Sequence, residues 1–417
     1  MTISIRDFII LRQGFEGKNL LQLQICRFPK GSYIIVEGKS DSDRFFIIQQ
    51  GGVQCYKSTG SGTAPVLLGA GDFVGVVSCM SGHLQIETAI AATDVVAIAV
   101  KREQYPDLIV NNTPVALKII KTFANRMRVM NEMLTKATLN SVVQESYEQI
   151  FKVAQFYEKA HKVDIATYAY YQYLKSRPTG PNAETAKQRF LALKSRAHPV
   201  YLEPSTETIR EYPQNTMIFS ESQPGKDMYI IQSGEVAISK VVNGNEVTLA
   251  VLKKGDMFGE MALLENKPRS ASAIAHSDCR IMVVNIANFN QMVATQPQMI
   301  SRLTTTLAER LWSMYRQLDN ANIRDPLAKM LDMLSLQIEK QKIQLDTLGS
   351  KQKQTELTPK DLATMCGIPN NLQPKAVYDF QQDSHVKIVE GKIFIKDMLE
   401  LSKQAAFYRK QISNNNN

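Results

Sequence analysis

Two patterns of hydrophobic and polar positions alternate along the 417-residue chain. Short runs rich in β-branched and aromatic residues, separated by glycine, fill residues 20–110 and again residues 204–295; MYIIQSG, EVAISKVV, NEVTLAVL and RIMVV are examples. Such runs between turn residues predict an antiparallel β-roll or jelly roll. Asn243-Gly244 stands between two of the runs and favours a tight hairpin turn there.

Helical spacing replaces the strand pattern after each β-rich region. Apolar residues recur every three or four positions from Ala116 to Met127 and from Met299 to Met314, which predicts one amphipathic helix behind each roll. We expect the second helix to begin after Asn288. Residues 140–197 also read as helical and predict a connector between the rolls. Its Tyr and Ala positions resemble one tetratricopeptide-type helix pair, with a plain helical spacer as the alternative.

The two β-rich regions are copies of one module. Matching residues stand 184 positions apart, with a one-residue slip in the middle: Pro29 with Pro213, Gly71-Asp72 with Gly255-Asp256, and Ala89-Ile90-Ala91 with Ala273-Ile274-Ala275. A helix pair between the modules cannot bury its own apolar face, so we expect it to dock on a roll or on a second subunit.

Charge and composition then narrow the function classes. The net charge of +9 favours nucleic acid as a binding partner. The excess of Lys and Arg lies in the middle of the chain, however, and not in its C-terminal region. Five scattered cysteines without a CxxC pair argue against a disulfide framework or a zinc site and favour a reducing cytoplasm. The sequence predicts no signal peptide, no membrane span, no metal site and no catalytic residues.

Candidate chemistry concentrates in Gly255 to Ala273, GDMFGEMALLENKPRSASA. A glycine-rich turn runs into a short helix from Glu260, and backbone N–H groups at a helix start attract anions. Arg269 follows, and its guanidinium suits a phosphate. Because a phosphate would repel Glu260, that carboxylate needs another target, such as a ribose hydroxyl. The combination favours a cyclic nucleotide over a free phosphate.

This string resembles the phosphate-binding cassette of cyclic-nucleotide-binding domains, F-G-E-x-A-L-x(4)-P-R-x-A. The resemblance implies that Glu260 binds the ribose 2′-OH and that Arg269 binds the cyclic phosphate. It also implies that Ser270 and the backbone of Gly259, Glu260, Met261 and Ala262 take the other phosphate oxygens, and that Leu249 and Ala250 touch the base. A plain Glu260–Arg269 salt bridge inside a degenerate roll is the alternative. The first module has Val76 and Gln85 at the matched positions, so we expect it to serve structure or contact.

The C-terminal region carries a second resemblance. A helix around DPLAKMLDMLSLQIEK, a capped helix from Thr358, a helix near Pro374 and a hairpin about Glu390-Gly391 resemble the winged-helix output domain of the bacterial catabolite-activator family. That resemblance makes Lys375 and Tyr378, with Lys387 and Lys392 of the wing, candidates for DNA contact. The expected recognition helix has no arginine for reading guanine, so a protein-contact role is the rival.

Together these observations predict an α+β chain of four domains. They are a degenerate cyclic-nucleotide-binding-like β-roll (1–139), a helical connector (140–200), a cyclic-nucleotide-binding β-roll (201–319) and a winged-helix-like domain (320–417). We expect a non-catalytic sensor of cAMP or cGMP that controls transcription. The alternatives are a scaffold that binds no DNA and a protein like the regulatory subunits of cyclic-nucleotide-dependent kinases. The second alternative is disfavoured because the sequence near the N-terminus has no Arg-Arg-x-Ser/Ala inhibitor segment. Besides the nucleotide, the sequence is compatible with three further binding partners: DNA, a second copy of the chain and another protein.

Overall fold

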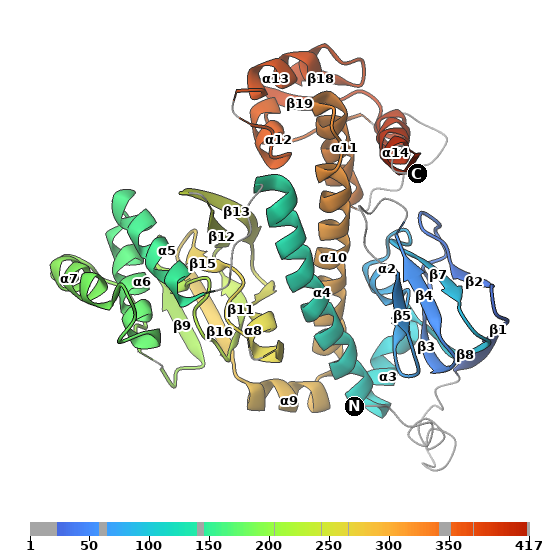
Figure 1. The fold of residues 1–417 in the computed structure, drawn as a ribbon, viewed down its shortest axis with the longest axis horizontal. Helices are drawn as coiled ribbons and strands as arrows, with labels where there is room; N and C mark the ends of the chain where they lie inside the picture. The colour runs from blue at the N-terminus through green and yellow to red at the C-terminus, as the bar shows by residue number, and fades with distance from the viewer. Residues whose placement is uncertain are drawn as a thin grey trace. The chain divides into compact units, whose positions relative to one another are not determined.

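The structure, a computed structural model, describes residues 23–57, 65–139, 146–203, 205–242, 244–265, 267–341, 352–369 and 371–414. These residues form two compact units (Figure 1). The first takes its residues from 1–107, 133–140 and 308–417, and the second from 108–132 and 141–307.

The first roll consists of two four-stranded antiparallel sheets, β1-β8-β3-β6 and β2-β7-β4-β5. Its elements are β1 (Gln24–Phe28), β2 (Tyr33–Ile35), β3 (Arg44–Gln50), β4 (Val53–Tyr56), β5 (Val66–Leu68), β6 (Phe73–Val74), α2 (Val76–Ser81), β7 (Thr88–Ala91) and β8 (Val95–Lys101). Helices η2 (Arg102–Gln104), α3 (Tyr105–Asn111) and α4 (Thr113–Leu139) follow. Alternate strand residues fill the space between the sheets, among them Ile48, Val53 and Ala97.

The second roll repeats this arrangement, with sheets β14-β11-β16-β9 and β10-β15-β12-β13. Its elements are β9 (Ile209–Tyr212), β10 (Met217–Phe219), β11 (Met228–Ser233), β12 (Val236–Val242), β13 (Asn245–Leu252), β14 (Met257–Phe258), α8 (Glu260–Glu265), β15 (Ser272–Ala275) and β16 (Cys279–Val284). Corresponding strands pair in the same order, so the predicted pair of antiparallel rolls is confirmed. The β12–β13 hairpin is present, while Asn243 of its turn lies outside the described residues.

Two equivalent glycines explain why the repeat survives in the sequence. Gly51 and Gly234 both adopt positive φ, 91° and 84°. A Cβ on either would lie 2.2 Å from a backbone carbonyl oxygen, that of Asp94 in the first roll and of Asp278 in the second. Only glycine tolerates both the conformation and the close approach, so the fold itself preserves these matches.

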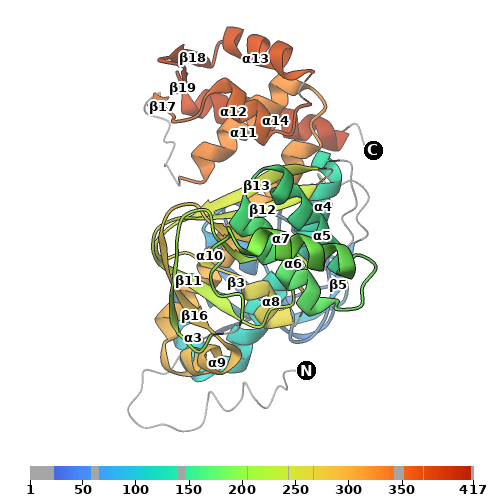
Figure 2. The ribbon, with the colours of Figure 1, turned by 90° about the vertical axis from the view of Figure 1, so that its left-hand side faces the viewer.

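The described part of the connector comprises three helices, α5 (Tyr147–Lys159), α6 (Val163–Ser176) and α7 (Ala183–Lys194), and not a single pair. Figures 1 and 2 show them beside the second roll, where α5 contacts β12 and α6 contacts β10. Their buried residues form one core with Met217, Val241 and Ile274 of those strands. The expected docking is therefore onto the second roll. Residues 140–145, the expected start of the first connector helix, lie outside the described residues.

Behind the second roll, the expected single helix is two helices. α9 spans Ile286–Thr295 and α10 spans Pro297–Ala321. The prediction that the helix begins after Asn288 is wrong, because Asn285 caps α9 by accepting from the N–H of Asn288. The break at Gln296 follows from the next residue, since a proline disfavours helical conformation in the residue before it.

The C-terminal region contains α11 (Pro326–Glu339), β17 (Lys353–Gln354), α12 (Pro359–Met365), α13 (Gln373–Gln382), β18 (Val386–Val389), β19 (Lys392–Ile395) and α14 (Met398–Asn414). The three strands form one sheet in the order β17-β19-β18. The expected helix starts are present: Thr358 and Asp361 form a capping box on α12, and Pro374 lies in the first turn of α13. The sequence did not predict α14, which packs against α11.

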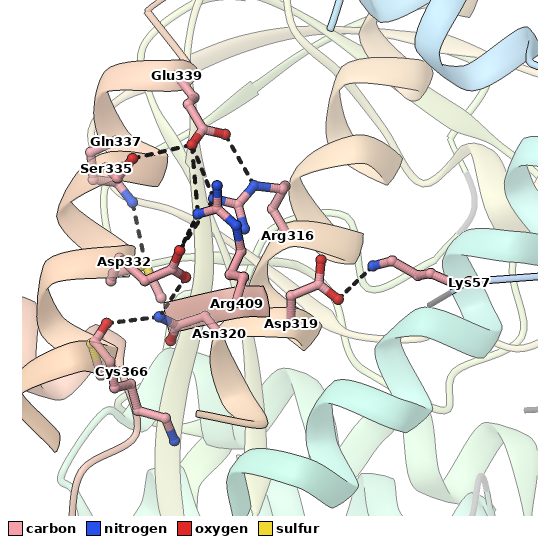
Figure 3. Close-up of polar contacts among 12 residues, drawn as sticks. Lys57, Arg316, Asp319, Asn320, Asp332, Ser335, Gln337, Glu339, Cys366 and Arg409 are labelled. Atoms are coloured by element: carbon pink, nitrogen blue, oxygen red, sulfur yellow. Dashed lines mark hydrogen bonds and ion pairs between the residues drawn. The ribbon is translucent and has the colours of Figure 1, made fainter. Parts of the chain in front are cut away.

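Buried charges connect three helices of this region (Figure 3). Asp332 on α11 has no exposed surface and accepts from Arg316 of α10, Asn320 and Arg409 of α14. Arg316 also pairs with Glu339 through two hydrogen bonds of 3.0 Å. Burial opposes both charges of that pair, yet Arg316 lowers the pKa of Glu339 and the nearby carboxylates raise the pKa of Arg316. In the same figure, Lys57 Nζ of the first roll lies 2.5 Å from Asp319 Oδ1.

Candidate functional site

The predicted cassette forms a tight turn between β14 and α8 in the second roll. Gly259 has a φ of +76°, and α8 begins directly after it at Glu260. A Cβ on Gly259 would lie 2.7 Å from Nη1 of Arg269 and 3.1 Å from the ring of Tyr229. Glycine is therefore required here both for its conformation and for the arginine that packs against it.

Arg269 is buried, with 4% of its surface exposed. Its Nη1 donates to the carbonyl oxygen of Gly259 at 2.7 Å. The guanidinium lies over the ring of Phe219, 4.2 Å from its centroid, and 5.4 Å from that of Tyr229. The Nε–H is buried without a hydrogen-bond partner. A buried N–H of this kind is costly unless something accepts from it, so an anion in this site would gain a ready donor.

The Arg269 side chain is enclosed by protein and does not face an empty pocket. Its backbone is also fixed, because its N–H donates to the carbonyl of Gln223 at 2.9 Å and its carbonyl accepts from Ser222 at 2.8 Å. The guanidinium fills the space above Gly225, where a Cβ would lie 2.4 Å from Nε. Arg269 is therefore held between its own cassette and residues 220–225.

The structure brings most of the predicted site residues together. Met261 and Ala262 are buried on α8 with Glu260, and the hydroxyl of Ser270 lies 3.6 Å from Sδ of Met261. Leu249 and Ala250 lie apart from this group, on β13, where both are exposed. Their predicted contact with a base stays a prediction.

The same position in the first roll holds neutral side chains. Val76 begins α2 as Glu260 begins α8. Gln85 is 2% exposed, and its amide nitrogen donates to the carbonyl of Asp41 at 3.0 Å. Its Oε1 is buried without a partner. This roll thus retains the backbone of the site with a neutral glutamine where the second roll has Arg269.

Sequence reasoning missed the residues around Arg269. Phe219 and Tyr229 lie beneath its guanidinium, while Gln223 and Gly225 border it from the preceding loop. The sequence gave only an indirect signal for these residues. They lie close to positions that match between the two modules, but they are not part of the cassette pattern. Their role depends on the β10 and β11 strands folding back onto the cassette.

The candidate DNA-contact residues lie on three elements of the C-terminal region. Lys375 and Tyr378 are on α13, both exposed, and Tyr378 has 63% of its surface accessible. Lys387 is exposed on β18. Lys392 on β19 forms an ion pair with Glu356 and is therefore already engaged.

The sequences of both rolls match the profile of one known domain family. The profile described as "Cyclic nucleotide-binding domain" matches residues 25–112 and residues 209–296. The chain carries two cyclic nucleotide-binding domains. The second of these contains Arg269 and the whole cassette, and the first contains Val76 and Gln85.

Relatives of this chain include regulators of two kinds. A CRP-like cAMP-activated global transcriptional regulator of Mycobacterium tuberculosis is 26% identical over 196 residues, covering 47% of this chain and 87% of the relative. A cyclic AMP receptor protein of Thermus thermophilus is 35% identical over 111 residues, covering 26% of this chain and 51% of the relative. A cAMP-dependent protein kinase regulatory subunit of Aspergillus niger is 35% identical over 92 residues, covering 22% of each chain.

The part of the chain that the structure describes has neither a metal-binding cluster nor a membrane-spanning helix. Across the ranges that the structure describes, His, Cys, Asp and Glu side chains form no group of three or more that could hold a metal ion. Within those same ranges, every helix is too short or too polar to cross a membrane.

Proposed function

We propose that this chain is a cyclic nucleotide sensor whose second domain binds one cyclic mononucleotide, cAMP or cGMP. One observation carries the proposal: Arg269 is a buried cation with an unpartnered Nε–H beside the Gly259 turn. A cyclic phosphate supplies both the negative charge and the oxygen that this N–H lacks. The matched domain family and the cAMP-responsive relatives support the same ligand class.

Each predicted site residue has a role in this proposal. Arg269 and Ser270 bind the cyclic phosphate, together with the backbone of residues 259–262. Glu260 accepts from the ribose 2′-OH. Leu249 and Ala250, which are exposed on β13, cover the base. The test is calorimetric titration of the full chain with cAMP and with cGMP separately; absence of binding to both would reject the proposal.

The proposed output is control of transcription through residues 320–417. The order helix, strand, helix, helix, hairpin from α11 to β19 is that of a winged helix and supports DNA contact. On this view α13 enters a groove with Lys375 and Tyr378, and Lys387 and Lys392 of the hairpin approach the backbone. Helices α9 and α10 join the nucleotide domain to this region, so ligand binding can bias its orientation if the two states differ in affinity.

A second function rests on a different observation. Lys392 is paired with Glu356, and Asp379 stands on the same helix as Lys375, so the expected DNA face has little free positive charge. A protein-contact scaffold, or a regulatory subunit like those of cyclic-nucleotide-dependent kinases, would fit such a face. A gel-shift assay with genomic DNA fragments, with and without nucleotide, separates the two: a ligand-dependent shift supports transcriptional control, and no shift favours the scaffold.

The proposal divides the chain at 1–139, 140–200, 201–319 and 320–417, with the first domain in a structural or contact role. We expect no catalytic activity of its own, a cytoplasmic location, and a second copy of the chain or another protein as further partner. The relatives' names, which describe regulators, support the non-catalytic assignment.

A further inference from the structure

Helix α6 of the connector lies against the loop that fixes Arg269. This loop, residues 220–225, joins β10 to β11 and is called here the arginine loop. The carbonyl of Gln223 accepts from the N–H of Arg269, and the N–H of Ser222 donates to the carbonyl of Arg269. Any change in the loop's position therefore moves the backbone from which the Arg269 side chain extends.

Tyr168 on α6 holds the loop through its hydroxyl group. The hydroxyl donates to the carbonyl of Ile218 at 3.0 Å and accepts from Nε2 of Gln223 at 3.4 Å. The other end of the same amide, Oε1 of Gln223, accepts from the N–H of Ser220 at 2.9 Å. The Tyr168 hydroxyl thus contacts both Ile218 at the end of β10 and Gln223 in the loop, and the backbone of Gln223 in turn holds Arg269.

Helix α5 holds the loop at a second point. Nε2 of Gln149 donates to Oε1 of Glu221 at 2.9 Å and to the carbonyl of Val241 at 2.9 Å. The N–H of Val241 donates to the same carboxylate oxygen at 3.1 Å. The loop is consequently tied to the connector on one side and to β12 on the other.

The first roll shows the same loop without this cover. The matching residues 36 and 37 there are half-buried, and Gly38, which has a φ of 78°, is exposed. In the second roll the corresponding residue is Ser222, at a φ of 62°, and residues 220–222 are all buried. A serine in this conformation is strained, and such strain persists only where the surroundings enforce it. The N–H of Ser222 is held by the carbonyl of Arg269, and the connector holds its two neighbours, Glu221 through Gln149 and Gln223 through Tyr168.

We propose that the connector is a positioning element for the nucleotide site, in which Tyr168 acts through Gln223 to hold Arg269 ready for the cyclic phosphate. The inference rests on the proposed function and extends it to regulation. Coupling of this kind is reciprocal, so a bound nucleotide stabilises the docking of α6 by the same factor by which docked α6 raises nucleotide affinity. A protein that binds the connector would in this way change the response to cyclic nucleotide.

The test compares two tyrosines on one helix in the full chain. Tyr168→Phe removes the hydroxyl that reaches the arginine loop. Tyr170→Phe is the matched control, because Tyr170 is equally buried and its hydroxyl donates to Glu158 inside the connector, at 2.6 Å. Calorimetry with cAMP and cGMP should show affinity about 3- to 10-fold weaker for Tyr168→Phe, the scale of one hydrogen bond, and little change for Tyr170→Phe.

A second readout separates positioning from general loosening of the fold. The Nε–H signal of Arg269 in a ¹⁵N NMR spectrum, assigned by its loss in Arg269→Lys, should shift in Tyr168→Phe and stay in place in Tyr170→Phe. Nucleotide should also slow amide exchange in α6 of the unmodified chain and not of Tyr168→Phe. Equal affinity in all three chains, or equal weakening by both variants, would overturn the inference.

The two proposals fail in different ways. If the unmodified chain binds neither nucleotide, the proposed function is rejected. The positioning role then stands or falls on the NMR comparison alone: a shift of the Arg269 signal only in Tyr168→Phe supports it, and an unshifted signal overturns it.

Discussion

Gln85 and Arg269 occupy the same backbone position in the two rolls. The N–H of Gln85 donates to the carbonyl of Lys39 at 2.9 Å, and the N–H of Arg269 donates to the carbonyl of Gln223 at 2.9 Å. Both side chains are buried, so the rolls place a neutral side chain and a charged one at the same backbone position. A neutral amide makes weaker hydrogen bonds to phosphate than a guanidinium does, and this difference separates the expected roles of the two domains.

The first prediction follows directly and concerns stoichiometry. Because the first roll has Gln85 and Val76 where the second has Arg269 and Glu260, we expect one cyclic nucleotide per chain. Calorimetric titration measures the number. Two sites of comparable affinity would contradict the prediction, and loss of the single site in Arg269→Ala would assign it to the second roll.

Replacing Arg269 by alanine should weaken nucleotide binding by about 2–3 kcal/mol, because the phosphate loses its charge-assisted hydrogen bonds. The unliganded protein should also lose about 1 kcal/mol of unfolding free energy, since the guanidinium packs over Phe219. Urea titrations with and without nucleotide measure both effects. Arg280→Ala, an exposed arginine of the same roll, is the control and should change neither. An affinity left intact by Arg269→Ala would support a purely structural arginine.

Glu221 should make the stability of the second roll depend on pH. Burial raises the pKa of its carboxyl above the ordinary 4.5, against the opposing effects of Gln149 and Lys240. Between the unfolded and folded pKa values the folded chain therefore binds more protons, and its stability falls as pH rises through that window. Below the window this contribution is fully present.

Glu221→Gln tests this directly, because the amide keeps an oxygen to accept from Gln149 and Val241. Its unfolding free energy relative to the unmodified chain should increase as pH rises through the window. Glu211→Gln, at an exposed position on β9, serves as the control. A pH-independent difference between Glu221→Gln and the unmodified chain would show that the carboxyl titrates normally.

Asp332 should be essential for the packing of the C-terminal helices. Alanine there removes the fully buried carboxylate that accepts from Arg316 and Arg409, so the two guanidiniums are left to share Glu339. Breaking a buried ion pair in this way typically costs about 3–5 kcal/mol. Amide exchange in α11 and α14 should accelerate accordingly. Glu400→Ala removes only a surface pair with Lys403 and should cost less than about 0.5 kcal/mol. Equal exchange rates in both variants would mean that Glu339 alone suffices to hold the two arginines.

DNA binding, where it occurs, should be dominated by backbone contacts. The face of α13 offers Lys375 but no arginine, so we expect weak sequence preference and a steep loss of affinity with rising salt. Competition binding with random and selected duplexes at two salt concentrations measures both. Tight, selective binding that Lys375→Ala abolishes would instead assign base reading to α13. No binding at any salt would favour the protein-contact scaffold.

The sequence determined the architecture of each domain because its signals are local or repeated. Strand runs between glycines, the capping pair Thr358 and Asp361, and Pro374 in the first turn of α13 each constrain a few neighbouring residues, and the structure has all of them. The repeat of matching residues identified two rolls, since positions such as Gly51 and Gly234, which match after the one-residue slip, tolerate only glycine. The helix break at Gln296 was missed, although its cause, a following proline, is also local.

The surroundings of each site residue were decided only by the tertiary structure. The cassette pattern identified Arg269, but not that its guanidinium is buried over Phe219 or that its backbone is held by Gln223. It gave no hint that Tyr168, about a hundred positions earlier, would hold Gln223. Such contacts depend on how strands and helices distant in sequence pack together. Packing is set by the shape and volume of many side chains at once, whereas a local pattern records only which of them are apolar.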